Sequence, residues 1–424
     1  MLRHWLLLLA VVALVASAGC ERTSASSSHV TELRFWNGFT GPDGRTMLAI
    51  VKRFNEANPD VHVTMQRMEW GTYYNKLFVA AMGGRAPEVF VIHTDTLARF
   101  TRANFVRPVD DWVKAGGVID PADIDPNVWS AVVHGGKHFA VPLDIHLLGM
   151  YYNRALLKEA KIAHPPTNRA EFIDALQKVR ALGKSDTWGF VYTWQRTNLY
   201  TMFRQNGGQI FSDDLSRVTL NEPKNVEALQ WAADLILKDK LVPAPQDFDS
   251  WIGFRQGKVA IVFEGIYMLP ELVKQKDLDY GAAPLPVLFD HPAAWANSHN
   301  LCLRADLSGD ELAAGERFIK YLSDNSLDWA AGGQVPVRKS LRASARFQSM
   351  YAQGEFAKQI PYACYMPKVP FIFEYQDQFD HALERALRGS AAPQAALDEA
   401  TANIEKVVER FRASDAAANS RAAR

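Results

Sequence analysis

The alternation of strand-like and helix-like segments after residue 30 constrains the fold of this chain more than any other feature. Short apolar runs typical of β-strands alternate with segments whose apolar residues recur at i, i+3, i+4 and i+7, the spacing of one buried helix face. The series is a strand at 33–36, a helix through Met47 to Phe54, a strand at 61–65, a helix through Tyr74 to Met82, and an apolar strand at 89–92. This β-α-β-α-β order predicts a doubly wound α/β lobe.

The ends of these strands are the expected place for a ligand, because open α/β sheets bind ligands at the carboxyl ends of their strands. Asn37-Gly38 follows the first strand and His93-Thr94-Asp95 follows the third. Asp95 also fits the N-cap of a helix that begins at Thr96. One carboxylate can cap a helix and bind a ligand, so both interpretations of Asp95 stay open.

A second α/β pattern begins at 141–146, with a strand that ends at Tyr151-Tyr152-Asn153 and helices near 168–182 and 222–240. Proline-rich residues 284–292 indicate a chain crossing. The length of 424 residues suggests two or three domains.

The overall composition excludes several classes of protein. The chain has 47 basic and 47 acidic residues, so it lacks the excess of positive charge that a nucleic-acid binder needs. Its three cysteines are too few for a disulfide framework or a four-thiolate zinc site. Cys302 and Cys364 are therefore predicted to be buried, unpaired thiols. The chain contains no G-x-S-x-G or H-E-x-x-H motif, and we predict no catalytic residue, metal or cofactor.

The amino-terminal segment is typical of an exported protein. Arg3 precedes an apolar run from Trp5 to Ala16, which is shorter than the roughly 20 residues that a membrane-spanning helix needs. We interpret residues 1–19 as a signal peptide. The Ser-Ala-Gly-Cys sequence that ends at Cys20 resembles a bacterial lipobox, which implies lipidation of Cys20 and a flexible tether over 20–30. An ordinary signal peptide with an incidental cysteine is the alternative.

Several short motifs follow one another in a recognisable order. They are Phe35-Trp36-Asn37-Gly38, Phe54-Asn55 before Asn58-Pro59, Gly-Arg-Ala-Pro-Glu-Val at 84–89, Phe-Ala-Val-Pro-Leu-Asp at 139–144, Tyr152-Asn153, Gly207-Gly208, Gly-Lys-Val-Ala at 257–260, Gly265-Ile266-Tyr267 and Val-Pro-Val-Arg at 335–338. In this order the chain resembles the extracellular solute-binding proteins of the maltose-binding-protein family, the capture subunits of ABC sugar importers. The resemblance extends over nearly the whole chain after the leader.

The resemblance implies a two-lobed periplasmic-binding-protein fold of type II, with a ligand cleft between two α/β lobes. It implies three crossings between the lobes, near 141–145, 293–297 and 335–339. The boundaries that follow are 31–141 plus 297–335 for the N-terminal lobe, 142–296 plus 336–413 for the C-terminal lobe, and 414–424 for a disordered tail.

The resemblance also implies a set of ligand-binding residues. Asp95 corresponds to a carboxylate that grips sugar hydroxyls, whereas His146 stands where relatives have an acidic ligand that Asp144 would replace. Tyr267, which follows Gly265, and Tyr375 correspond to aromatic platforms, although each ring also fits a place in the core. Trp194 and Asn198 match a segment that lines the cleft in the second lobe of the family. The remaining candidates follow from position alone, and they are Asn37, Trp70, Asn297 and His299.

The expected function is that of a non-catalytic, lipid-anchored receptor outside the cytoplasm. It would capture a mono- or oligosaccharide by hinge closure and deliver it to the transmembrane subunits of an ABC permease. We expect a monomer that does not bind nucleic acid. Two alternatives stay open. The same fold would bind glycerol-phosphate or another small anion if a basic cluster that includes Arg338 lined the cleft. An exported glycoside hydrolase would use a carboxylate pair such as Asp95 and Asp144.

Overall fold

The computed structural model describes residues 30–192, 194–245 and 247–422. Its first sheet has the strand order β2-β1-β3-β12-β6. β1, β2 and β3 are parallel, and β12 runs antiparallel to β3. The strands are β1 (Thr31–Asn37), β2 (Val61–Arg67), β3 (Val89–His93), β6 (Val141–Pro142) and β12 (His299–Leu303). The predicted parallel lobe is therefore present, with the two later strands β12 and β6 added beside β3.

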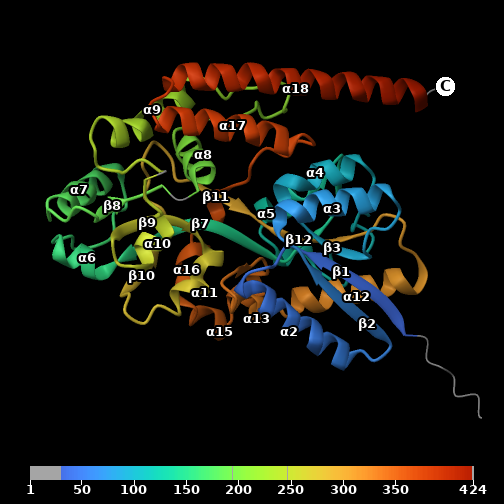
Figure 1. The fold of residues 1–424 in the computed structure, drawn as a ribbon. Helices are drawn as coiled ribbons and strands as arrows, with labels where there is room; N and C mark the ends of the chain where they lie inside the picture. Colours follow the sequence, from blue (N-terminus) through green and yellow to red (C-terminus); the bar gives the residue numbers. More distant parts are fainter. Residues whose placement is uncertain (1–29, 193, 246, 423–424) are drawn as a thin grey trace, which may run out of the picture.

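Helices cover both faces of the first sheet (Figure 1). They are α2 (Pro42–Ala57), α3 (Trp70–Met82), α4 (Thr94–Arg102), α12 (Gly309–Asp324) and α13 (Ser326–Ala330). Alternate residues of β3 separate the two faces, since Val91 packs with α2 and α12 whereas Ile92 packs with α3 and α4. Helix α2 begins with a proline in its first turn and ends before Pro59, as helix geometry requires.

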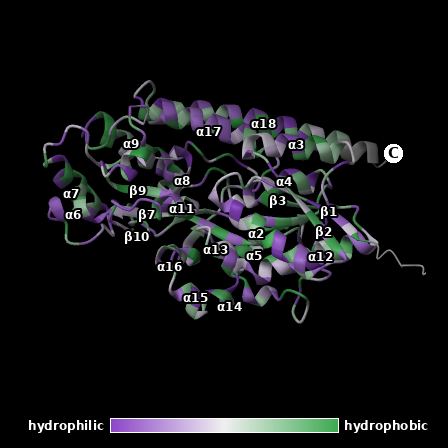
Figure 2. Cartoon of the chain, turned by 60° about the horizontal axis from the view of Figure 1, so that its bottom comes forward, coloured by the Kyte–Doolittle hydropathy of each residue, from purple (hydrophilic) through white to green (hydrophobic). Residues whose placement is uncertain are grey.

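The second sheet is built around the long strand β7, which is buried along almost its whole length. Its order is β14-β11-β7-β9-β8, and β10 and β13 also pair with β7. The strands are β7 (Asp144–Asn153), β8 (Trp188–Phe190), β9 (Val259–Gly265), β10 (Tyr280–Ala283), β11 (Ala294–Asn297), β13 (Val335–Pro336) and β14 (Ala363–Cys364). In Figure 2 the strands of both sheets are mostly hydrophobic, whereas hydrophilic residues gather on outward-facing helices such as α18.

The remaining elements surround the second sheet or connect the two sheets. They are α5 (Pro126–Ala131), α6 (Arg154–Glu159), α7 (Arg169–Arg180), α8 (Gln195–Gln205), α9 (Pro223–Leu237), α10 (Ser250–Arg255), α11 (Leu269–Leu272), α14 (Lys339–Arg342), α15 (Ala345–Gln348), α16 (Tyr351–Ala357), α17 (Ile372–Leu387), α18 (Pro393–Ala422), the hairpin β4 (Val133–His134) and β5 (Lys137–His138), and the 3-10 turns η1 (Pro121–Asp123), η2 (Ile266–Met268) and η3 (Ile360–Tyr362). None of the described helices is both long and apolar enough to cross a membrane.

The two-lobed α/β fold is confirmed, and the chain passes between the sheets near the predicted places. It crosses at residue 143, between β6 and β7, and at residue 298, between β11 and β12. It crosses again between α13 and β13, because Val335 pairs with Ile145 of the second sheet. Segment 121–131, predicted for the N-terminal lobe, packs its Ile124 and Val128 into the core of the second sheet.

The carboxyl-terminal helix differs from the prediction. We expected a disordered tail over 414–424, but α18 continues to Ala422, so the expectation is wrong for residues 414–422. The physical reason is that this stretch is rich in alanine, which has the highest helix propensity. Arg102 of α4 forms an ion pair with Asp415 and lies over the ring of Phe411, so α18 reaches from the second lobe to the first (Figure 1).

The two described cysteines are free thiols, as predicted. Cys302 is fully buried in β12 of the first sheet, as predicted. Cys364 in β14 of the second sheet is only partly buried, so the prediction of a buried thiol is wrong for this residue. The predicted signal peptide, Cys20 and the tether up to residue 29 lie outside the described residues, as do residues 423–424.

Candidate functional site

A cavity of about 550 Å³ lies between the lobes, where strand ends of the two sheets meet. Because β12 is antiparallel to β3, its amino end lies at the carboxyl edge of the parallel strands, which is the edge expected to bind a ligand. The lining residues are Gly38, Thr40, Gly41, Pro42, Asp43, Trp70, His93, His146, Trp194, Thr197, Tyr267, Met268, Trp295, Asn297 and His299. Both sheets thus contribute to one site.

Aromatic side chains form much of the cavity wall. Trp70 begins α3, Trp194 immediately precedes α8, Tyr267 lies in the turn after β9, and Trp295 is in β11. Trp194 is 54% exposed, which is unusual for so large an apolar residue. Flat rings that line a cavity suit a ligand that also has an apolar face.

Two glycines allow two of these rings to lie against the backbone. A Cβ atom on Gly38 would come within 2.1 Å of the Trp70 ring, and one on Gly265 would come within 2.1 Å of the Tyr267 ring. Neither position can therefore carry a side chain without moving the ring. Gly265 is absent from the lining of the cavity and acts by making room for Tyr267.

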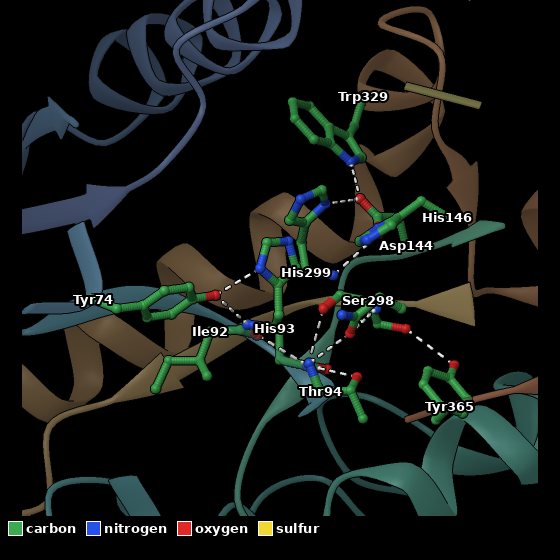
Figure 3. A network of polar contacts seen from close by, with 12 residues as sticks. Tyr74, Ile92, His93, Thr94, Asp144, His146, Ser298, His299, Trp329 and Tyr365 are labelled. Atoms are coloured by element: carbon green, nitrogen blue, oxygen red, sulfur yellow. Dashed lines mark hydrogen bonds and ion pairs between the residues drawn. The ribbon is translucent and has the colours of Figure 1, made fainter. Parts of the chain in front are cut away.

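Three histidines from three strands meet at the cavity. His93 ends β3, His299 begins β12 opposite it, and His146 lies in β7. The ring centroids are 5.4 Å apart for His93 and His146, 4.9 Å for His93 and His299, and 4.4 Å for His146 and His299. Figure 3 shows His93 and His299 between Tyr74 on one side and Asp144 on the other, with His146 beside Asp144.

Each of these imidazoles has an oxygen partner at Nδ1. His93 Nδ1 lies 2.6 Å from the Tyr74 hydroxyl oxygen. His146 Nδ1 lies 3.2 Å from Oδ1 of Asp144, and His299 Nδ1 lies 2.7 Å from Oδ2 of the same carboxylate. Burial, together with the charge of His299, lowers the pKa of His146 and lowers that of His93 well below its usual value.

Asp144 lies beneath the histidines and does not reach the cavity. It is fully buried, and it also accepts hydrogen bonds from the His299 backbone N–H (3.1 Å) and from Trp329 Nε1 (2.5 Å). Burial alone would raise the pKa of this carboxyl group, but the two histidines hold the pKa well below its usual range. Asp144 is therefore an ionised group that orients two imidazoles.

Two further acidic groups lie at the cavity wall or directly behind it. Asp43 lines the cavity in the first turn of α2, where it accepts a hydrogen bond from the Gly44 N–H (2.7 Å), and burial raises its pKa. Glu264 is only 1% exposed, and its Oε1 accepts hydrogen bonds from Trp194 Nε1 and the Gly265 N–H, both at 2.8 Å. Burial raises the pKa of Glu264 to about 8, so it is mostly protonated at neutral pH.

The structure brings some of the predicted site residues together at the cavity and not others. The residues that line it are Trp70, His146, Trp194, Tyr267, Asn297 and His299. Those that do not line it are Asn37, Asp95, Asp144, Asn198, Gly265, Arg338 and Tyr375. Asn37 and Asn198 are buried, and their side chains bond to backbone groups, so they shape the walls from behind.

Three of these placements differ from what the sequence led us to expect. Asp95 is in the first turn of α4, whose N-cap is His93, so the N-cap interpretation of Asp95 is wrong. Arg338 forms ion pairs with Asp123 and Asp324 away from the cavity. Tyr375 is fully buried in the core of the second lobe.

The sequence analysis missed other lining residues, and for some a signal was present. Thr40 to Asp43 continue the loop after β1, so the strand-end argument that selected Asn37-Gly38 extends to them. His93 follows β3 directly, but the family resemblance favoured its neighbour Asp95. No sequence pattern singled out Thr197, Met268 or Trp295. These residues line the cavity because of the path that the backbone takes in the folded chain.

Comparison with known proteins identifies the class to which this fold and cavity belong. The family described as bacterial extracellular solute-binding protein matches residues 39–325, and the chain belongs to this family. The predicted family resemblance is confirmed, and membership indicates an exported protein.

The similarities to individual proteins extend over most of the chain. A maltotriose-binding protein of Pyrococcus abyssi is 20% identical to this chain, and the alignment covers 89% of this chain and 80% of that protein. A periplasmic sn-glycerol-3-phosphate-binding protein of Yersinia pseudotuberculosis is 22% identical, and the alignment covers 92% of this chain and 94% of that protein. The structure of a Listeria monocytogenes ABC substrate-binding protein in complex with cycloalternan has a TM-score of 0.80 at 21% identity, and the match covers 90% of this chain and 99% of that one.

Proposed function

We propose that this protein is the extracytoplasmic substrate-binding subunit of an ABC sugar importer. The observation that carries the proposal is the aromatic-walled cavity between the lobes, which also presents the side chains of Asp43 and Asn297. A ligand that contacts both lobes favours the arrangement in which they are close, so binding drives hinge closure. The closed, loaded protein then docks on the transmembrane subunits of the permease.

The chemistry of the cavity suits a neutral sugar. The hydroxyl groups of a sugar both donate and accept hydrogen bonds, and carboxylate, amide and imidazole groups satisfy them in fixed directions. The C–H faces of a pyranose ring are apolar and stack on tryptophan or tyrosine. The similar proteins named for maltotriose and bound to cycloalternan support an oligosaccharide ligand.

An anionic ligand such as glycerol-phosphate is the alternative that the Yersinia relative raises. The described residues that line the cavity include no lysine or arginine, and burial raises the pKa of Asp43 despite the opposing effect of His299. Arg338, which an anion site was expected to use, is paired with two aspartates elsewhere. These features favour a neutral sugar over a phosphate.

The protein acts, in this proposal, as a receptor without catalytic activity. The suspected hydrolase pair was Asp95 and Asp144, and neither carboxylate lines the cavity. Asp144 in addition has both of its oxygens occupied by buried donors. Bound oligosaccharide should therefore be recovered chemically unchanged after prolonged incubation, as chromatography of the released ligand would show.

The export and anchoring of the chain rest on residues outside the described part. In this proposal a signal peptide is removed and Cys20 receives the lipid that holds the protein at the membrane. Cys20→Ser should yield a protein that is left uncleaved or is released into the soluble fraction. A variant that is cut at the same place and still partitions into detergent would show that Cys20 is not the anchor.

Thermal-shift screening against a panel of neutral glycans tests the proposed ligand class. A ligand in excess stabilises the folded protein by an amount that grows with its concentration over Kd. At least one mono- or oligosaccharide should raise Tm, whereas glycerol-phosphate should not. A shift with glycerol-phosphate and none with any sugar would contradict the proposal.

A further inference from the structure

The histidine cluster has a geometry that sugar binding does not require. His93, His146 and His299 each offer a ring nitrogen, and these nitrogens lie within 4.8 Å of one another. Among the described residues, no other group of three or more histidine, cysteine or acidic side chains comes together in this way. Neutral imidazole is a preferred ligand of zinc, copper, nickel and cobalt.

We propose that His93, His146 and His299 form a binding site for one divalent transition-metal cation of the zinc type. Each histidine would bind through the ring nitrogen that Tyr74 or Asp144 leaves free. Three imidazoles leave one position of a tetrahedral cation open, and here that position faces the cavity. The site is independent of which solute the cavity takes.

The groups around the histidines match those that support metal-binding imidazoles. Such histidines usually donate the N–H of their second nitrogen to a carboxylate or another oxygen, which fixes the ring and its tautomer. Here Asp144 holds Nδ1 of His146 and of His299, and the Tyr74 hydroxyl holds Nδ1 of His93. Nε2 of the three makes no hydrogen bond to another described side chain or backbone group.

The spacing of the nitrogens requires a modest contraction. Zinc binds imidazole nitrogen at about 2.0–2.1 Å, which sets tetrahedral ligands about 3.3 Å apart. The nitrogens are at most 4.8 Å apart, so some pairs must approach by up to about 1.5 Å. His93 and His299 belong to the first sheet and His146 to the second, so a small relative movement of the lobes brings the third ligand closer.

The charges around the cluster also favour a cation. The buried carboxyl group of Asp144 contacts two of the three rings directly, and Asp43 and Asp95 act electrostatically on His299 and His146, respectively. None of the described residues that line the cavity is a lysine or arginine. A divalent cation would thus balance a negative environment.

Metal titration of the full mature chain tests the site. The protein is purified with its anchor in detergent, stripped with a chelator and titrated with ZnCl₂ by calorimetry and with CoCl₂ by visible absorption. We expect one equivalent per chain, a rise in Tm with zinc, and the intense ligand-field bands of cobalt in a four-coordinate site. Absence of saturable binding, or cobalt bands of a six-coordinate aquo ion only, would overturn the proposal.

Substitutions identify the ligands. His93→Gln, His146→Gln and His299→Gln should each weaken zinc binding at least tenfold and abolish the cobalt bands. The matched control is His138→Gln, because His138 also pairs its Nδ1 with a carboxylate, that of Asp110 at 2.7 Å, but belongs to no group of three possible ligands among the described residues. Equal zinc affinity in the three variants and the wild type would overturn the proposal.

A milder variant keeps the test informative if a histidine variant folds poorly. Tyr74→Phe removes the oxygen partner of His93 and leaves all three imidazoles in place. It should weaken zinc binding roughly tenfold while retaining the cobalt bands, because positioning groups typically contribute that much to affinity. Zinc affinity unchanged in Tyr74→Phe, together with cobalt bands that persist in the histidine variants, would place the metal elsewhere.

Discussion

At the scale of single residues, Trp194 combines an exposed aromatic face with one polar contact. Its ring is 54% exposed at the cavity, and its Nε1–H donates to the buried Glu264. The exposed face makes little contribution to the packing of the free protein, so it is available to a ligand. The hydrogen bond fixes the orientation of the ring. The two roles can be separated by substitution.

Trp194→Ala should weaken binding of the identified sugar about tenfold, because the stacking face is lost, and should change the Tm of the free protein little. Trp194→Phe keeps an aromatic face and loses the hydrogen bond, so its affinity for the sugar should lie between those of the wild type and Trp194→Ala. Calorimetry on both variants measures this, with Trp251→Ala as a control outside the cavity. Wild-type affinity in Trp194→Ala would remove the ring from the site.

Glu264 should make stability depend on pH. Its pKa is about 8 in the folded protein against an ordinary value of 4.5, so the folded state binds more protons between these values. Stability therefore falls as the pH rises from about 4.5 to about 8, and below about 4.5 the group has no destabilising effect.

Glu264→Gln should remove this dependence while keeping an acceptor for Trp194. The variant should match the wild type in urea unfolding at pH 4.5 and exceed it at pH 8.5 by on the order of a few kcal/mol. An equal difference at both pH values would show that the carboxyl group titrates normally.

At the scale of elements, the periodicity of apolar residues predicted strands and helices well, whereas amino-acid composition predicted them less well. The strands and helices between residues 31 and 93 were predictable because their apolar residues recur with clear periods of two or about 3.6. The end of α18 was not predictable, because an alanine-rich tail without an apolar face has no sequence pattern that distinguishes a frayed segment from a helix. Its contact with α4 depends on residues about 310 positions away.

The site was predictable only in part for a related reason. Trp70, Tyr267 and His299 follow or precede strands whose ends meet, so their positions indicated the cavity. Asp95 also follows such a strand, but the turn of α4 leaves it off the wall, and Tyr375 lies within α17 and points into the core. A family motif gives the position of a residue along the chain, whereas its orientation depends on the packing of the whole element.

The contact of α18 with α4 should depend on an aromatic ring more than on an ion pair. The side chains of Arg102 and Asp415 are 38% and 52% exposed, and exposed pairs contribute about 0–1 kcal/mol. Phe411 packs against Phe371 with ring centroids 5.1 Å apart and lies under the Arg102 guanidinium.

Phe411→Ala should therefore lower the free energy of unfolding by about 1–3 kcal/mol, whereas Asp415→Asn should change it by less than about 1 kcal/mol. Urea unfolding measures both variants. A larger effect of Asp415→Asn would mean that the ion pair is the main attachment of the helix.

At the scale of the whole molecule, contacts outside the cavity also join the lobes. Arg99 of α4 belongs to the first lobe, and its guanidinium lies over the ring of Phe78 in the same lobe and over that of Phe373 in α17. Its Nη1 is 3.7 Å from Glu374, also in α17. The Tyr74 ring lies 5.7 Å from Phe373 on the same side. These contacts exist only while α4 and α17 are close, so they favour the arrangement of the lobes seen here.

A ligand that contacts both lobes must overcome any tendency of the lobes to separate. Arg99→Ala removes contacts that hold them together, so it should shift the free protein toward separated lobes and weaken sugar binding a few-fold without changing the cavity. Small-angle scattering should show a larger radius of gyration for the free variant and a wild-type value with saturating ligand. Arg53→Gln is the control, because Arg53 pairs with Asp328 within the first lobe. Unchanged affinity and unchanged scattering in Arg99→Ala would mean that the balance between the two arrangements is set at the crossings rather than by the contact of α4 with α17.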